Sequence, residues 1–397
     1  MVEREAQEPG PSLAQSGSRF GALANTMLTM TRQRSSSCLQ VEVVASSAAF
    51  ADLRTEWNAL VSRSDDQIFY RHEFIETWLN HFSTGEWRIL LLRDMAGCLV
   101  GVLPLLRGWT RLHGLPIRRL SGTANLHSGR FDLVADQPEH ASAAFLDYLG
   151  GQRDWDVLIL TELPGQGRSR ALEQVAAERG FPTGRWSAMQ SPCCMLPATW
   201  EELEAQLTGR FRANLRRRRR ALEALGKVQV IRCSDSVELV EAGIQLELSG
   251  WKGRAGTAMA QDVDTCGFYT DLARVLGAQG QLALWAMYLD QRLIAFQFGL
   301  EHRGSYALLK PAYDESCSRY SPGQLLMAEV LRDAINRGLS RFEFLGEDMP
   351  WKQDWRPDTR SQDWLFVFPR SAGGRLLQSF KFSLLPRLRS ITRSMHR

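Results

Sequence analysis

The sequence predicts a mixed α/β protein in which one arrangement of helices and strands occurs twice. Two β-hairpins, Trp87–Leu106 and Leu282–Leu300, each follow helical segments and precede a strand, a helix and a further strand. Each turn is acidic (Asp94–Gly97 and Asp290–Arg292) and leads into an apolar strand with a small residue. Two hairpins in the same order of elements favour a tandem repeat. The 397 residues suffice for two or three domains at ~100–200 residues each.

In the first half, the spacing of apolar residues defines the elements in order. A strand at Val41–Val44 precedes two helices, because apolar residues around Trp57 and Trp78 recur at helical spacing. The first hairpin follows them. The remaining predictions are an apolar segment at Phe131–Val134, a helix near Glu139–Leu149, a strand at Trp155–Leu160, a helix at Arg168–Glu178 and a short apolar run at Cys193–Leu196.

The second half begins with a long helical stretch, Trp200–Leu225, and a strand at Val228–Ile231. Helices near Val237–Leu248 and Gly267–Leu276 then lead into the second hairpin. The last predictions are a strand at Tyr306–Tyr313, a helix at Pro322–Asn336 and strands at Arg341–Leu345 and Trp364–Phe368. A basic extension from residue 371 has six Lys or Arg and no acid.

Composition excludes several classes of protein. Hydrophobic residues are 44% and charged residues 23%, which is ordinary for a globular protein and excludes overall disorder. No apolar run approaches the ~20 residues of a spanning helix. Seven scattered cysteines fit neither a disulfide scaffold nor a zinc site, so we expect thiols in a reducing compartment, the cytoplasm, and no metal.

The loop after the strand at Tyr306–Tyr313 is a candidate ligand site. Ser321 is a residue type that caps helix N-termini, and Pro322 suits a first turn where no N–H is needed. Gly323 allows close approach of a ligand or another backbone. A helix N-terminus can hold a pyrophosphate through its free N–H groups, although the same residues also fit a merely well-capped helix.

A second candidate follows the strand Arg341–Leu345. That strand delivers Gly346, Glu347 and Asp348 to its carboxyl end, close to Lys352. Ligands of open α/β sheets tend to bind outside the carboxyl ends of strands, and a carboxylate there can act as general base toward an amine or hydroxyl. The alternative is an ordinary loop with a Lys–Asp pair.

These two segments carry a family resemblance. Tyr313-Asp314…Tyr320-Ser-Pro-Gly323 and Phe344-Leu-Gly-Glu347…Trp351-Lys352…Trp355 resemble acyltransferases of the GNAT superfamily of the cellulose-biosynthesis (CelD/BcsL-like) type. Three further segments are similar to that family: Phe74–Trp78, Gly101–Leu105 and Phe211–Arg217. The resemblance covers roughly residues 40–370 and implies two tandem GNAT-like domains, as in the FemABX aminoacyltransferases, each with a mixed, mostly antiparallel sheet flanked by helices.

The domain boundaries follow from the repeat and the resemblance together. We expect a flexible tail at 1–37, a first domain at 38–197 on the acceptor side, a second domain at 198–370 with the donor site, and the basic extension at 371–397. The first half has Ala135–Glu139 at the corresponding place, which is acidic and lacks glycine, so we expect only the second domain to bind a donor.

The resemblance also implies a co-substrate and residue roles. The co-substrate is acetyl-CoA or another acyl-CoA, although the loop matches the usual Gln/Arg-x-x-Gly-x-Gly/Ala signature only loosely. The acceptor attacks the thioester directly in a ternary complex. Glu347 or Asp348 accepts the proton, and Tyr320 or Tyr313 protonates the leaving thiolate. Donor contacts are expected from Ser321, Gly323, Gln324, Lys310 and Lys352, and acceptor contacts from Arg216, Arg217, His127 and Trp351.

Positive charge is concentrated in one segment. The formal net charge is only +4, yet seven arginines fall within Arg210–Arg220. Five consecutive arginines cover every face of a helix, so this is a solvated basic helix, a clamp for an anionic substrate, or a tRNA contact. His127 lies in a glycine-rich loop. In the functional interpretation this loop lines the interdomain cleft, and in the alternative His127 has only a structural role.

The expected function is acyl transfer, most simply of acetyl, to an amine or hydroxyl on a sugar-containing acceptor, in exopolysaccharide or cellulose biosynthesis. Two alternatives stay open: an aminoacyl-tRNA-dependent FemABX-like ligase, and a non-catalytic polysaccharide-assembly binding protein. The basic extension allows peripheral contact with a membrane surface. Nucleic acid other than tRNA is not expected, because aromatic residues are not interleaved with the arginines apart from Phe211.

Overall fold

A single sheet runs through the computed structural model, which describes residues 33–34, 39–112 and 114–384. Most of the tail predicted at 1–37 lies outside these residues, as does the extension beyond 384. Among the described residues the strand order is β1-β2-β3-β4-β5-β7-β14-β8-β13-β12-β11-β10-β9, with β6 paired to β4. The strands are β1 (Gln33–Arg34), β2 (Gln40–Val44), β3 (Glu86–Arg93), β4 (Leu99–Leu112), β5 (Leu115–Gly122), β6 (Val134–Ala135), β7 (Val157–Pro164), β8 (Thr183–Met195), β9 (Val228–Cys233), β10 (Leu282–Leu289), β11 (Arg292–His302), β12 (Ser305–Tyr313), β13 (Arg341–Glu343) and β14 (Asp358–Val367).

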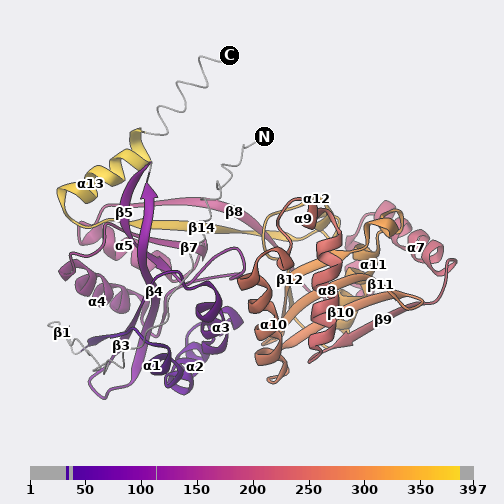
Figure 1. Ribbon diagram of the computed structural model, residues 1–397, viewed down its shortest axis with the longest axis horizontal. Coiled ribbons are helices and arrows are strands. Elements are labelled where there is room, and N and C mark those ends of the chain that lie inside the picture. The colour runs from indigo at the N-terminus through magenta and orange to yellow at the C-terminus, as the bar shows by residue number, and fades with distance from the viewer. Residues whose placement is uncertain (1–32, 35–38, 113, 385–397) are drawn as a thin grey trace, which may run out of the picture. The chain divides into compact units, whose positions relative to one another are not determined.

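Helices cover both faces of this sheet (Figure 1). They are α1 (Ser47–Ala51), α2 (Arg54–Arg63), α3 (His72–Phe82), α4 (Pro138–Gly151), α5 (Ser169–Glu178), α6 (Trp200–Gln206), α7 (Gly209–Glu223), α8 (Val237–Ser249), α9 (Trp251–Arg254), α10 (Val263–Gly277), α11 (Pro322–Asn336), α12 (Pro350–Gln353) and α13 (Ala372–Ser379). Short helical turns lie at η1 (Ile68–Tyr70), η2 (Met259–Gln261), η3 (Glu315–Tyr320) and η4 (Phe380–Leu384). The predicted fold class, a mixed α/β protein with a mostly antiparallel sheet flanked by helices, is confirmed.

The order of elements repeats as the hairpins predict. A strand, helices, three antiparallel strands, a helix, a strand, a helix and a last strand occur from β2 to β8 and again from β9 to β14. We call these the first repeat (Gln40–Met195) and the second repeat (Val228–Val367). In each repeat one pair of strands is parallel, β5 with β7 and β12 with β13, whereas the other pairs of described strands are antiparallel.

The last strands of the two repeats are exchanged. β8 closes the first repeat in sequence, yet its Cys193–Met195 pairs with β13 of the second repeat. β14 closes the second repeat but pairs with β7 of the first repeat and with β8 from Thr183 to Cys193. Figure 1 shows β8 and β14 running side by side between the two sets of helices. The sheet therefore continues across the boundary predicted at residues 197 and 198.

The hydrophobic core also joins the repeats. One cluster of buried residues combines α1–α3 with β3 and β4 of the first repeat, and α8 and α10 with β10 and β11 of the second. The aromatic rings of Phe74 and Phe268 meet edge to face inside it, with centroids 5.8 Å apart. A separate cluster packs α6, α7 and α11 against the opposite face of the second repeat. Each side chain on β12 therefore faces either α8 and α10 or α11.

Several predicted elements were wrong in extent. The helix predicted at Trp200–Leu225 is two helices, because Thr208 is extended and its hydroxyl accepts from Phe211 N–H, which caps α7. The strand predicted at Phe131–Val134 reduces to Val134–Ala135. Strand β5 was missed, and β8 and β14 are much longer than their apolar runs, because polar residues alternate along both.

Candidate functional site

The parallel pair β12 and β13 separates early. The strands pair only from Ser305 with Arg341 to Ala307 with Glu343. β12 continues to Tyr313, and among the described residues no strand pairs with this stretch on the β13 side. A bulge at Leu309 interrupts its pairing with β11, since Leu308 opposes Gly299 and Lys310 opposes Phe298. Beyond Ala307 this edge of β12 thus has no strand partner among the described residues, but Pro311 has no N–H and its carbonyl already accepts from Lys252 Nζ at 3.1 Å.

In the first repeat, the gap that opens where the parallel strands β5 and β7 separate is occupied by the segment around Phe131. β5 pairs with β7 only from Arg119 to Ser121. Beyond this point Phe131 donates its backbone N–H to the carbonyl of Glu162 at 3.0 Å, and its side chain is buried. A Cβ on Gly122 would lie 2.7 Å from the Phe131 ring, so the ring packs on the face of β5 while the Phe131 backbone takes the place beside β7. The two repeats differ at the same structural position.

Helix α11 begins beside the open edge of β12. Ser321 is at the N-cap position, as predicted, with φ 50° and ψ 56°. Its side chain makes no capping hydrogen bond to the helix. Its hydroxyl donates instead to the Ser318 carbonyl at 3.4 Å. Pro322 occupies the first turn, as expected. Gly323 follows, and a Cβ there would lie 3.6 Å from the Tyr313 ring. Pro322 has no N–H, and the N–H groups of Gln324 and Leu325 donate to the Ser321 carbonyl at 3.0 and 3.1 Å, which leaves the N–H of Gly323 at the start of α11.

The predicted donor residue Gln324 is engaged within the protein. Its Nε2 donates to the Trp351 carbonyl at 2.8 Å, and its Oε1 accepts from Trp355 Nε1 at 2.6 Å. Both ends of the amide thus attach α11 to α12. Tyr320 is half-buried under the Arg319 guanidinium, 4.6 Å from the ring centroid, whereas Tyr313 is exposed at the end of β12.

Lys352 organises the loop that carries Glu347 and Asp348. Its buried Nζ donates to the carbonyls of Leu345 and Glu347, at 2.5 and 2.7 Å. Leu345 and Gly346 both have positive φ, 52° and 56°, and the lysine holds this turn in place. Burial lowers the pKa of Lys352 to about 8, against the opposing effect of the neighbouring Asp348 and Glu347 charges.

The two predicted base candidates are exposed on this loop. Asp348 accepts a hydrogen bond from Gln353 Nε2 at 2.5 Å. Trp351 lies beside Lys352, whose Nζ is 5.6 Å from its ring centroid, and it meets the ring of Phe344. The structure therefore brings Glu347, Asp348, Trp351 and Lys352 together with Gln324 at one end of the second repeat.

His127 lies between the repeats. Its Nδ1 is 3.2 Å from the hydroxyl of Tyr269 on α10, and its ring stacks on Phe82 with centroids 5.4 Å apart. Burial, with the positive charge of Lys310, lowers its pKa to about 3, so the imidazole is neutral at physiological pH. No motif or spacing in the sequence points to Tyr269, which this contact adds to the site.

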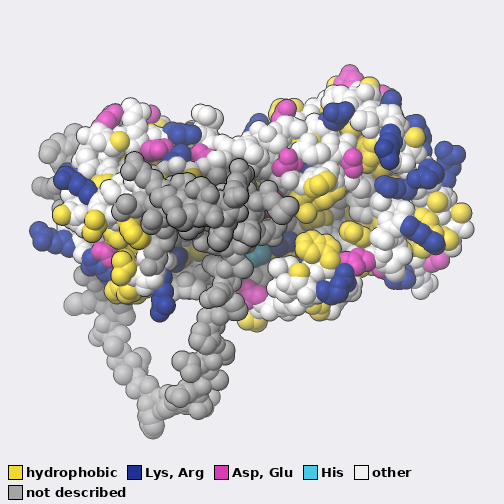
Figure 2. Space-filling model, turned by 90° about the horizontal axis from the view of Figure 1, so that it is seen from above, with side chains coloured by type: hydrophobic (Ala, Val, Ile, Leu, Met, Phe, Trp, Pro, Cys, Tyr) yellow, Lys and Arg dark blue, Asp and Glu magenta, His cyan; other side chains and the backbone are white. Residues whose placement is uncertain are grey.

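The arginine helix α7 packs its apolar side and exposes most of its charge. Phe211 and Leu215 are buried toward α11, while Arg219 pairs with Glu329 of α11 at 3.0 Å. The candidates Arg216 and Arg217 are exposed and contact Glu204 and Asn214, at 3.1 and 3.3 Å. Figure 2 shows Lys and Arg side chains gathered over the end of the second repeat that carries α7. Within the described residues, neither arginine contacts another predicted site residue.

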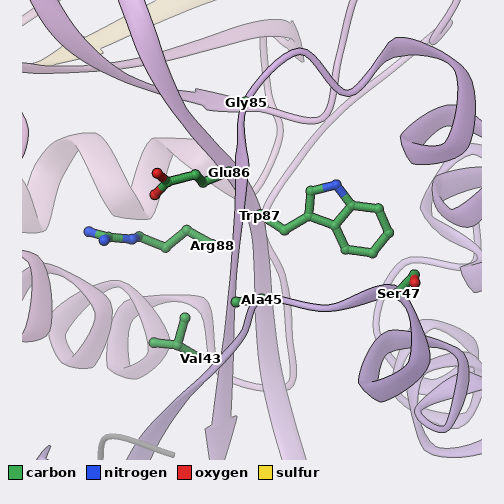
Figure 3. Close-up of a pocket in the computed structure, with 7 residues that line it drawn as sticks. All are labelled: Val43, Ala45, Ser47, Gly85, Glu86, Trp87 and Arg88. Carbon is green, nitrogen blue, oxygen red and sulfur yellow. The ribbon is translucent and has the colours of Figure 1, made fainter. Parts of the chain in front are cut away.

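A surface hollow at the edge of the first repeat contains none of the candidates. Figure 3 shows it along β2 and β3, where Trp87 points to one side and Glu86 and Arg88 to the other. Glu86 pairs with Arg107, and Arg88 pairs with Asp154. The hollow lies where side chains of β3 point alternately to the two faces of the sheet. Its charged side chains are already paired, so it brings no reactive groups together.

Two kinds of feature are absent from the described residues. No three His, Cys, Asp or Glu side chains there are grouped closely enough to hold a metal ion. None of the helices in the same residues has the length and apolarity needed to cross a bilayer.

Comparison by sequence matches part of the chain to a known family. The family model described as an acetyltransferase (GNAT) domain matches residues 209–353, which run from α7 to the end of α12. The matched segment contains the open edge of β12, α11 and the Lys352 loop. Among curated proteins, none matches the chain.

Comparison by structure extends the likeness to most of the chain. FemX is 14% identical with a TM-score of 0.56, covering 79% of this chain and 95% of FemX. A conserved protein of unknown function from Bacteroides thetaiotaomicron is 12% identical, with a TM-score of 0.54 and coverage of 82% and 99%. The C-terminal domain of a putative lysylphosphatidylglycerol synthetase from Agrobacterium fabrum is 11% identical, with a TM-score of 0.51 and coverage of 84% and 96%. At these low identities the TM-scores show a shared fold alone, and the domain match to residues 209–353 describes that fold as GNAT-type.

Proposed function

We propose that this chain, whose fold is that of a GNAT-type acyltransferase, transfers an acyl group from coenzyme A to an amine or hydroxyl, with its donor site in the second repeat only. The acyl group proposed is acetyl, and the acceptor contains a sugar and belongs to exopolysaccharide synthesis. The domain division predicted at residue 198 is kept as part of this proposal, with the exchanged strands linking the two domains.

The observation that carries the proposal is the difference between the two splits. In the second repeat the edge of β12 is open and ends beside the N-terminus of α11. In the first repeat Phe131 fills the equivalent space. An extended pantetheine arm can hydrogen-bond to an unpaired strand edge, and a pyrophosphate suits the N–H groups and positive dipole end of a helix.

The same geometry supports the predicted roles. The donor thioester would lie along β12, with Glu347 and Asp348 on the neighbouring loop to accept the proton of the attacking group. Tyr313 is exposed at the end of β12 and is proposed to protonate the leaving thiolate, with Tyr320 as the alternative. Lys352 positions the loop through its two carbonyl contacts.

The test uses a match between the two repeats. Gly323 is the second residue of α11, after Pro322, and Glu139 is the second residue of α4, after Pro138. Gly323→Glu gives α11 the acidic start of α4, and it should weaken acetyl-CoA binding at least tenfold in calorimetric titration. A glutamate near a helix N-terminus is favourable for the helix itself, so the fold should persist.

Two control variants accompany this test. Gly323→Ala should bind acetyl-CoA within twofold of the parent, because its Cβ makes only ordinary contact with Tyr313. Glu139→Gln should leave the affinity unchanged. Failure of the parent protein to bind acetyl-CoA at millimolar concentration would contradict the proposal. If aminoacyl-tRNA bound in its place, the ligase alternative would hold.

A further inference from the structure

Lys310 carries a half-buried positive charge that no carboxylate pairs with directly among the described residues. Its Nζ lies 5.3 Å from the centroid of the Tyr269 ring and, within the part of the chain that the structure describes, makes no hydrogen bond or ion pair. Burial lowers the pKa of Lys310 to about 8, and the charge of Lys252 lowers it further, whereas Glu247 acts in the opposite direction. At pH 7 the side chain is therefore still an ammonium.

The neighbouring carboxylate is already engaged. Glu247 is buried, and its Oε1 accepts from Lys252 Nζ at 2.5 Å. Its Oε2 accepts from Met259 N–H at 2.8 Å. Lys252 Nζ also donates to the carbonyl of Pro311 at 3.1 Å, so it stays at the edge of β12. Two ammonium groups thus share one buried carboxylate.

The remaining groups around Lys310 do not supply the missing charge. His127 is neutral and bonds to Tyr269 and Thr265, with Nε2 3.5 Å from the Thr265 hydroxyl. Asp262 is occupied as the N-cap of α10, where it accepts from Thr265. Two ammonium groups near one carboxylate leave an excess of positive charge at this junction, and an anion brought next to Lys310 would neutralise it.

Lys310 faces away from the pyrophosphate position. Residues 310 and 298 are paired, and Phe298 belongs to the core that packs against α8 and α10. Tyr313 lies on the opposite face of β12, against Gly323 of α11. The body of the sheet separates Lys310 from the N-terminus of α11, so the lysine is poorly placed for the donor contact that the sequence predicts.

We propose that Lys310 binds an anionic group of the acceptor, a carboxylate or a phosphate, at the junction of the His127 loop, α10 and β12. This proposal rests on the proposed acyl transfer and narrows its substrate to acceptors that carry an acidic group as well as the amine or hydroxyl. Lys252 adds to the positive potential, and the Tyr269 ring supports the lysine stem.

The test measures binding of two simple probes to the full chain by calorimetry at pH 7. Inorganic phosphate and acetate represent the two anions, and the one that binds identifies the acidic group. Binding should weaken at least tenfold in Lys310→Met and stay within threefold in Lys310→Arg, which keeps the charge. Lys227→Met, at an exposed lysine, is the matched control and should leave binding unchanged. Raising the pH to 9.5 should weaken binding as Lys310 loses its proton.

Acetyl-CoA titrations of the same variants separate the possible failures. Lys310→Met should bind acetyl-CoA within twofold of the parent, and a tenfold loss would return Lys310 to the donor site and overturn the proposal. The proposal would also be overturned if Lys310→Met bound phosphate and acetate as tightly as the parent does. It would be overturned as well if the parent bound neither anion. Failure of the parent to bind acetyl-CoA contradicts the proposed function, whereas failure to bind both anions contradicts only the Lys310 site.

Discussion

At the scale of single residues, the polar side chains at this end of the second repeat divide into those bonded within the protein and those that are exposed. Gln324 and Lys352 use their polar atoms on the protein itself, which fixes α12 and the turn at Gly346. Glu347 and Asp348 project from that turn and are exposed. The fixed loop therefore presents carboxylates beside the open strand edge, as a general base requires.

The carboxylate roles are tested by substitution. Glu347→Gln or Asp348→Asn should lower kcat about 100-fold or more for the one that acts as base, measured by release of the free coenzyme A thiol. The affinity for acetyl-CoA should stay within twofold, because the side chains are assigned to the acceptor proton. Full turnover in both variants would remove the base from this loop.

The buried ammonium of Lys352 predicts a pH-dependent stability. Its pKa of about 8 lies below the usual value of 10.5, so the unfolded chain binds more protons between these pH values. The free energy of unfolding, relative to Lys352→Met, should rise by up to ~3 kcal/mol from pH 8 to pH 10.5. Chemical denaturation across this range checks it, with the exposed Lys227→Met as control; a flat difference would contradict the shift.

At the scale of elements, the two repeats show how one strand arrangement is kept open or closed. β12 and β5 both separate early from their parallel partners. Phe131 closes the split beside β5, and no comparable ring closes the one beside β12 among the described residues. In the first repeat this position is therefore part of the hydrophobic core.

Removal of this ring should cost stability without creating a second donor site. Phe131→Ala leaves a cavity beside Gly122 and should lower the free energy of unfolding by about 3–5 kcal/mol. Acetyl-CoA should still bind at one site per chain, because α4 begins with Glu139 instead of glycine. Denaturation gives the first quantity and calorimetric stoichiometry the second; two sites per chain would contradict the assignment of the donor to the second repeat alone.

At the scale of the whole molecule, exchanged strands and a shared core make the repeats interdependent. β14 completes the sheet of the first repeat, and α3 packs on α10 within one cluster. A buried pair, Arg130 with Glu343 at 2.7 Å, adds a charged contact across the same junction. We therefore expect both repeats to unfold in one cooperative transition.

The buried pair provides the test of that cooperativity. Glu343→Gln leaves Arg130 buried without its counter-charge and should cost about 3 kcal/mol, with fluorescence and circular dichroism still reporting one coincident midpoint. Glu315→Gln breaks the exposed pair with Arg254 and should leave the unfolding midpoint unchanged within experimental error. Two separate transitions in Glu343→Gln would show that the repeats unfold independently.

The sequence by itself determined the features that depend on neighbours along the chain. Apolar spacing and Pro322 located α11 at its observed bounds, and the two acidic turns located both hairpins. The repeat follows from the same local patterns, as does the placement of Glu347, Asp348 and Lys352 on one loop, because these residues are adjacent in sequence.

Only the tertiary structure decided the features that join distant segments. The exchange of β8 and β14 pairs residues more than 160 positions apart, such as Cys193 with Asp358. The packing of Phe131 against Gly122 also depends on contacts between distant elements, which no local pattern predicts. The same holds for the grouping of His127, Tyr269 and Lys310. Periodicity specifies which face of an element is apolar, whereas the burial and charge that define this site arise when those faces pack together.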